Sequence, residues 1–222
     1  MKIITDTLHT KGFTISDDFL PLNVAQDVIK IYSNNLEWKR QEQIRPDHYK
    51  HVFKFESDLL PGENEEYRAK FWRWDYEKGA EKIDSMYKEH FKPLIESYTK
   101  KQILDYEISC MKMEKGDYYR VHLDGWQGKL NTIYYLNTDW KWDWGGLLHV
   151  VKDNDESISE TIMPKFNRMV ILNNEKFRSP HFVTTVNEYS LESRSTLCSW
   201  IKEIENEKSC FYNWGYWSRW FV

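Results

Sequence analysis

The first hundred residues contain two stretches whose apolar positions follow the period of a helix. Residues 22–32 and 81–98 repeat apolar side chains at steps of three and four, which places them on one helix face. Pro93 lies inside the second pattern, so we expect that helix to be kinked or split there. Apolar stripes of this kind pack on something broad, most simply a β-sheet. Residues 39–76 follow neither period clearly and predict strand fragments and a long loop.

From residue 103 onward the pattern changes to short runs of β-branched and aromatic residues, separated by turn residues. About eight short strands after a helical layer favour an α+β, mostly β fold, namely a double-stranded β-helix (jelly roll) with supporting N-terminal helices. The predicted strands are residues 103–113, 118–124, 131–137, 146–152, 157–162, 168–173, 181–187, 194–203 and 210–217.

Composition narrows the class of protein. The 222 residues suit one domain, and 41 % hydrophobic with 30 % charged residues indicates a packed core. The net charge is −4 and the basic residues are scattered, which argues against a nucleic-acid partner. No apolar run approaches the roughly 18 residues that span a membrane, and the N-terminus lacks the apolar core of a signal peptide. Three cysteines without a CxxC pair are typical of a reduced, intracellular protein, so we expect a cytoplasmic location.

The stretch "RVHLDGW", residues 120–126, suggests a metal site. On an extended strand, His122 and Asp124 point to the same face. A third ligand should come from a distant strand, and His181 in "SPHFVTTV" is the natural candidate. Two imidazoles and one carboxylate leave three metal positions open, which suits non-haem Fe(II). The H-x-D spacing alone is a weak signal, because an ordinary histidine and aspartate on a solvated strand would read the same way.

A second pattern follows in "RSTLCSW", residues 194–200. On a strand, alternate residues from Arg194 onward share one face, which places Thr196 beside the arginine. A buried guanidinium next to a hydroxyl is a clamp for a carboxylate, because its planar fork binds both oxygens. A metal triad with a carboxylate clamp is what 2-oxoglutarate requires. The alternative is that Arg194 is a structural ion-pair partner.

At this point the chain resembles a known family. The stretch from about residue 110 to 202 is similar to the catalytic barrel of the Fe(II)/2-oxoglutarate dioxygenases, in particular the prolyl 4-hydroxylase-like group. Hypoxia-type prolyl hydroxylases are the most similar of the named groups, through "IYYLN.DW" and "PKF.R". The order and spacing of five segments carry the resemblance: "YYRVHLDG", "LNTIYYLNTDWKWDWGGLLHV", "PKFNRMVILNN", "SPHFVTTV" and "SRSTLCSWI".

The resemblance implies roles for individual residues. His122, Asp124 and His181 would be the iron ligands, and together with Arg194 they would form the catalytic set. Arg194 would pair with the far carboxylate of 2-oxoglutarate, with Tyr135 as a helper, and Thr196 could join them. The chain departs from the family at Met113, where many members have a tyrosine, so the pocket loses one hydroxyl or another group replaces it.

The resemblance also implies that the Gly145–Gly146 pair allows a tight turn into the next strand. His149 follows this pair, and the sequence does not decide whether it faces the iron or the solvent. The expected layout is one dioxygenase domain spanning residues 1–222. It comprises helical support and a substrate loop (1–102), the catalytic jelly-roll core (103–203) and a C-terminal aromatic extension (204–222).

The function implied is an oxidoreductase that hydroxylates an unactivated C–H bond, with Fe(II), 2-oxoglutarate and O₂ consumed to give succinate and CO₂, and with ascorbate as an accessory reductant. The expected substrate is a prolyl residue or a related amino acid or peptide. Retention of Asp124 favours hydroxylation, because related halogenases keep that ligand position free for halide. Two alternatives remain, a dioxygenase acting on a nucleobase or another small molecule and a jelly-roll binding module without turnover. Oligomeric state is open.

Overall fold

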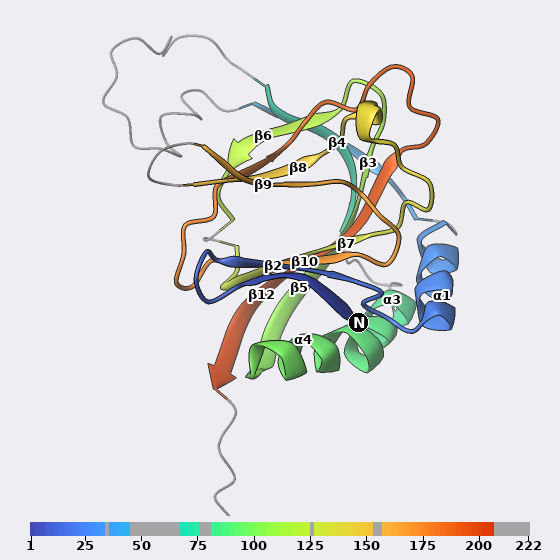
Figure 1. Cartoon of the computed structure of the whole chain (residues 1–222). Helices are drawn as coiled ribbons and strands as arrows, with labels where there is room; N and C mark the ends of the chain where they lie inside the picture. Colours follow the sequence, from blue (N-terminus) through green and yellow to red (C-terminus); the bar gives the residue numbers. More distant parts are fainter. Residues whose placement is uncertain (34–35, 45–66, 76–80, 125–126, 153–156, 207–222) are drawn as a thin grey trace, which may run out of the picture.

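The computed structural model describes residues 1–33, 36–44, 67–75, 81–124, 127–152 and 157–206. The strand expected at residues 210–217 and most of the loop expected within 39–76 lie outside these ranges. The described residues form one curled antiparallel sheet with helices against one of its faces (Figure 1). No helix in these ranges is long and apolar enough to cross a membrane.

The helical elements and strands have the following bounds. The helical elements are α1 (Leu22–Ser33), α3 (Glu81–Met86), the π-helix η1 (Tyr87–Phe91), α4 (Lys92–Thr99) and the 3₁₀ turn η2 (Trp142–Trp144). The strands are β1 (Lys2–Thr7), β2 (Phe13–Asp17), β3 (Lys39–Ile44), β4 (Tyr67–Asp75), β5 (Lys101–Met113), β6 (Tyr118–His122), β7 (Leu130–Tyr135), β8 (Leu148–Val151), β9 (Ile158–Ile162), β10 (Met169–Asn173), β11 (His181–Val183) and β12 (Arg194–Asn206).

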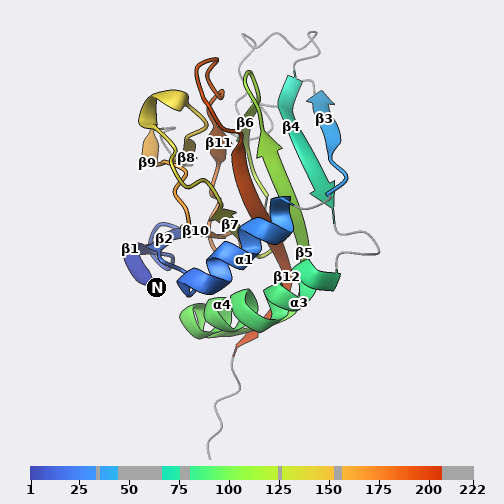
Figure 2. The ribbon, with the colours of Figure 1, turned by 90° about the vertical axis from the view of Figure 1, so that its right-hand side faces the viewer.

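The strand order is β1-β2-β10-β7-β12-β5-β4-β6-β11-β8-β9, with β3 paired to β4. Strand β4 pairs with both β5 and β6, so the sheet folds over there and its two ends face each other as layers. One layer contains β12 and β5 and carries α1, α3 and α4 on its outer face (Figure 2). The other layer contains β6, β11, β8 and β9. This is the jelly-roll fold, as predicted, with apolar clusters under the helices and between the layers.

The helical stretch of residues 81–99 is interrupted near the proline, as expected. Helix α3 ends at Met86, and a π-helical turn occupies Tyr87–Phe91 before α4 begins at Lys92. Pro93 lies at the start of α4, where its missing N–H costs little. The turn buries the Tyr87 hydroxyl, which lies 2.8 Å from Ser199 Oγ and so links the helical layer to β12.

Two strands were missing from the sequence prediction. Strands β1 and β2 pair with each other, and β2 extends the larger layer by pairing with β10. Strand β1 is a mostly exposed edge, so it carries no apolar run. Strand β2 alternates apolar and polar residues only over Phe13–Ser16, a short stretch, and all five of its positions are buried.

Asp17, buried at the end of β2, pairs with Arg168 and Lys165 in a cluster that should make stability depend on pH. Arg168 Nε and Lys165 Nζ donate to its two oxygens at 2.7 and 2.6 Å. Burial alone would raise the pKa of Asp17, but the hydrogen bonds and charges of Arg168 and Lys165 outweigh it and lower that pKa. The stabilisation is therefore complete above the ordinary unfolded pKa of about 3.9, and it is lost as the pH falls through the lower folded value.

We expect Asp17→Asn to lower the free energy of unfolding by about 2 kcal/mol at neutral pH. The loss should shrink as the pH falls below about 4. Urea unfolding at several pH values measures this. Asp27→Asn is the control, because Asp27 pairs with Lys30 on an exposed helix surface, where such pairs contribute little. Equal losses for the two variants at neutral pH would contradict the prediction.

Candidate active site

The two candidate histidines lie side by side on adjacent strands of the smaller layer, the one that contains β6, β11, β8 and β9. Strand β6 ends at His122 and β11 begins at His181, and the two residues are paired in register. Asp124 follows two residues after His122, and all three side chains are buried. Nε2 of His122 lies 3.7 Å from Oδ1 of Asp124, and Nε2 of His181 lies 3.5 Å from Oδ2. One donor atom from each residue lies within 4.8 Å of the others, so the set could hold a metal ion.

Backbone carbonyls fix the tautomer of both histidines. Nδ1 of His122 lies 2.8 Å from the carbonyl oxygen of Arg120, and Nδ1 of His181 lies 2.8 Å from that of Ser179. A carbonyl oxygen only accepts, so each Nδ1 carries the hydrogen in the neutral ring. Each Nε2 then presents a lone pair toward Asp124, which is the arrangement of metal-binding histidines.

The surroundings of Asp124 favour its ionised form. Burial alone would raise the pKa of this carboxyl, but His122, His181 and the indole N–H of Trp200 outweigh it and hold the pKa well below its ordinary value. Asn131 Nδ2 also donates a hydrogen bond to Oδ2 of the same carboxylate. With both imidazoles in their neutral form, the site offers one anionic and two neutral donors, which suits a divalent cation with open positions.

Arg194 is the first residue of β12 and is 3 % exposed. Its Nε donates to the carbonyl oxygen of Gly146 at 2.8 Å, and one terminal nitrogen donates to the Tyr135 hydroxyl at 3.3 Å. The guanidinium carbon lies 5.1 Å from the centre of the Tyr135 ring. No acidic residue in the described ranges forms an ion pair with Arg194, so this buried cation lacks a countercharge from the protein that has been described.

The Gly145–Gly146 turn explains why Arg194 can lie so deep. Both glycines have positive φ angles, +68° and +63°, which side chains rarely adopt. A Cβ on Gly145 would lie 2.0 Å from the carbonyl oxygen of Thr185, and one on Gly146 would lie 3.1 Å from Cδ of Arg194. The predicted tight turn therefore also makes room for the guanidinium.

Hydroxyl groups surround the same end of the cavity. Burial raises the pKa of Tyr135, and the neighbouring Arg194 does not cancel that effect, so the phenol keeps its hydrogen. The Tyr135 oxygen accepts from Arg194 and leaves its own O–H to donate. Thr196 is buried and lies opposite Tyr135 in the β12–β7 ladder. Met113 is paired with Arg194, so the position that often carries a tyrosine in the family supplies no hydroxyl here.

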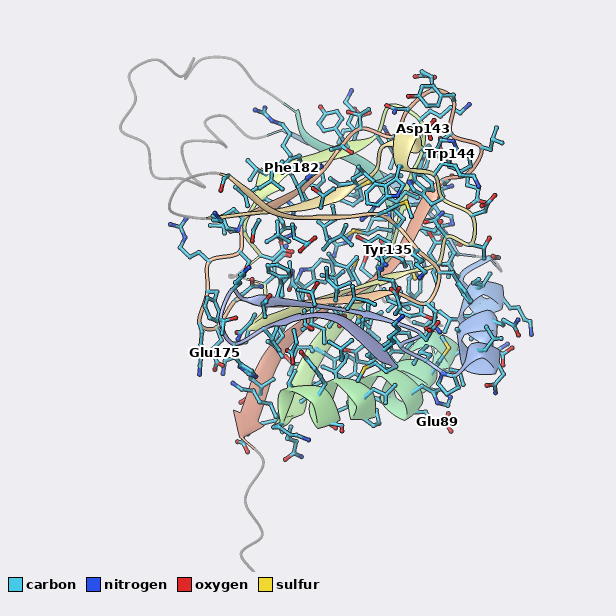
Figure 3. The ribbon with its side chains drawn as sticks, in the orientation of Figure 1. Glu89, Tyr135, Asp143, Trp144, Glu175 and Phe182 are labelled. Atoms are coloured by element: carbon cyan, nitrogen blue, oxygen red, sulfur yellow. The ribbon has the colours of Figure 1, made fainter. Side chains whose placement is uncertain are left out.

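One cavity joins the two halves of the site between the layers, where Figure 3 shows Tyr135. Its apolar middle is formed by Met111, Ile133 and Cys198. The candidate residues that line it are His122, Asp124, His181, Arg194 and Thr196, and Tyr135 adjoins it through Arg194.

His149 lies outside this cavity. His181 and Val183 line the cavity, so Phe182 between them points to the opposite face of the strand. The His149 ring stacks on Phe182 with centroids 4.7 Å apart, and its Nδ1 lies 2.9 Å from Thr161 Oγ1. The residue therefore belongs to the outer face of the smaller layer.

Two lining residues escaped the sequence prediction. Tyr119 stacks on His122 with centroids 3.9 Å apart and an interplanar angle of 9°, so it fixes the ring plane of a candidate ligand. Asn131 contacts Asp124, as described above. Counting back in steps of two from Tyr135 along β7 would have placed Asn131 on the inner face.

Comparison with known proteins shows which proteins this chain is similar to. Residues 108–202 match the model of the 2OG-Fe(II) oxygenase superfamily. A prolyl-4-hydroxylase from Pseudomonas putida is 16 % identical, with 89 % of this chain and 96 % of that chain covered and a TM-score of 0.56. A prolyl hydroxylase from Trichoplax adhaerens, in complex with a peptide fragment of the hypoxia-inducible factor oxygen degradation domain, is 18 % identical, with 91 % and 87 % covered and a TM-score of 0.59.

An oxidoreductase of the 2OG-Fe(II) oxygenase family from Burkholderia pseudomallei is 11 % identical, with 87 % of this chain and 86 % of that chain covered and a TM-score of 0.60. The comparison with curated protein sequences gives no significant match. The segment that carries the candidate site is therefore similar to the 2OG-Fe(II) oxygenases, an enzyme class that uses Fe(II) and 2-oxoglutarate, and its His-Asp-His set could hold a metal ion. Its fold is that of prolyl hydroxylase-like members of this class.

Proposed function

We propose that the protein hydroxylates an unactivated C–H bond, with His122, Asp124 and His181 holding iron and Arg194 holding 2-oxoglutarate. One observation carries the proposal: a buried His-Asp-His set and a buried arginine without a described acidic partner line the same cavity. An oxo acid with two carboxylates matches both ends of the cavity, the metal site and the arginine. Its oxo-acid end would reach the metal site, and its far carboxylate would supply the missing countercharge.

Different residues would bind the two ends of 2-oxoglutarate. Arg194 would receive the far carboxylate through its planar fork, with the Tyr135 hydroxyl and Thr196 as additional donors. The apolar middle of the cavity excludes water between the two ends, which strengthens both electrostatic contacts. With iron and 2-oxoglutarate bound, the site supplies an oxidant for C–H bonds, while O₂ is consumed and succinate and CO₂ are released. The two histidines and Asp124 keep their places because carbonyls and side-chain donors hold them.

The substrate that we propose is a prolyl residue or a related amino acid or peptide. The similar folds named as prolyl hydroxylases support this choice, since they cover nearly the whole chain. We further propose one dioxygenase domain, because β1, β2 and the helices pack on the same sheet as the metal-binding strands. Assays that measure succinate release should include ascorbate as a reductant and compare prolyl peptides with free proline.

An anaerobic absorbance titration tests the site. Addition of Fe(II) and then 2-oxoglutarate to the parent protein should produce the weak visible metal-to-ligand band of a chelated oxo acid. His181→Ala should not show the band, because it lacks one of three ligands. His149→Ala is the matched control, since that histidine lies on the outer face of the same layer, and it should behave like the parent. A parent protein that gives no band would refute the proposed site.

A further inference from the structure

Asp124 is held by two nitrogen donors that both contact the same oxygen. Asn131 Nδ2 donates to Oδ2, and Trp200 Nε1 donates to that oxygen at 3.4 Å. All three side chains are buried, and all three line the cavity. A carboxylate oxygen has two lone-pair sites, so the two donors occupy Oδ2 and leave Oδ1 for another partner.

The sheet register places the two donors together. Asn131 of β7 and Trp200 of β12 lie directly opposite each other in the antiparallel ladder. The orientation of the amide follows from chemistry, because an ionised carboxylate accepts only and must face the NH₂ group. In this orientation Asn131 Oδ1 is buried without a partner among the described residues. An unpaired buried carbonyl is unfavourable, so stability of the fold alone does not explain an asparagine here.

We propose that Asn131 and Trp200 are positioning residues that hold Asp124 so that it offers only Oδ1 to the metal. The proposal rests on the proposed function, because it takes Asp124 as an iron ligand. Without these donors, the carboxylate group could rotate and offer both oxygens. A second bound oxygen would occupy a position that 2-oxoglutarate or O₂ requires. The two donors therefore keep coordination positions free and also strengthen metal binding.

Metal affinity of the metal-free protein tests the proposal without turnover. Asn131→Leu removes the donor at similar volume and should weaken Mn(II) binding by about 10- to 100-fold, as measured by the electron paramagnetic resonance signal of free Mn(II). Trp200→Phe keeps a large ring and should give a smaller loss, since its hydrogen bond is long. Asn173→Leu is the matched control, because Asn173 is buried on β10 and its amide donates to the Leu8 carbonyl instead. It should bind Mn(II) like the parent.

The visible spectrum of the Co(II)-loaded protein gives a readout that a merely structural role would not change. A switch of Asp124 from one bound oxygen to two alters the coordination number, so Asn131→Leu and Trp200→Phe should change the d–d bands and Asn173→Leu should not. If Asn131→Leu does not fold, Trp200→Phe carries the test. Parent-like affinity and spectra in the donor variants would overturn this proposal and leave the proposed function intact. A parent protein that binds Mn(II) no better than Asp124→Gly would instead refute the iron site.

Discussion

Asp124→Gly is expected to abolish hydroxylation, with substrate-dependent succinate formation falling by at least about 100-fold. Asp124 is the one anionic donor of the buried set, and its loss leaves two neutral imidazoles to hold a dication. Removal of a hydrogen-bonding neighbour of a metal ligand already costs 10- to 100-fold in comparable sites, so loss of the ligand should cost more. Mass spectrometry of the product and a succinate assay measure the effect.

The matched control for this substitution is Asp139→Gly. Asp139 is exposed, pairs with Lys141 and does not line the cavity. The control should keep parent-like succinate formation. Normal turnover by Asp124→Gly would show that the metal, if present, is held elsewhere, and the proposed site would be wrong.

The second large effect is expected at Arg194. Arg194→Leu should weaken 2-oxoglutarate binding by roughly 30-fold or more, because truncating one partner of a buried charge pair costs about 2–5 kcal/mol. Metal binding should stay at the parent level, since Arg194 does not contact the His-Asp-His set in the described structure. An anaerobic titration of the visible band with 2-oxoglutarate measures the affinity, and Mn(II) binding by the same variant confirms that it is folded.

Arg194→Lys separates charge from geometry at this position. Lysine keeps the positive charge but loses the planar fork and the Nε donor that contacts Gly146. We therefore expect an affinity for 2-oxoglutarate between those of the parent and Arg194→Leu. Parent-like affinity in Arg194→Leu would assign the co-substrate carboxylate to another group.

The sequence predicted the barrel strands well because they alternate or form short apolar runs between turns. It also predicted the irregularity within residues 81–98, since a proline inside a helical pattern kinks or splits the helix. It failed at β1, a mostly exposed edge strand, and at β2, whose burial depends on pairing with β10, more than 150 residues later in the chain. Pairing between distant segments leaves no local period.

In the candidate site, too, the sequence predicted the residues with a local pattern and missed those whose role depends on distant pairing. His122 and Asp124 were predictable because a spacing of two residues brings side chains to one face, and the fold then brings His181 opposite His122. Asn131 was not predicted, because an asparagine at the start of a strand carries no signal of its own. Its role depends on the register between β7 and β12, which the sequence does not state.

Strand β12 also fixes the position of the carboxylate clamp relative to the metal site. It carries Arg194 at its first residue and Trp200 six residues later, and both side chains line the same cavity. Pairing with β5 on one side and β7 on the other prevents this strand from slipping. The interval between the carboxylate clamp and the metal site is therefore built into the sheet. If the proposed function holds, oxo diacids with shorter or longer carbon chains than 2-oxoglutarate should bind less tightly, because they cannot reach the clamp and the metal site together.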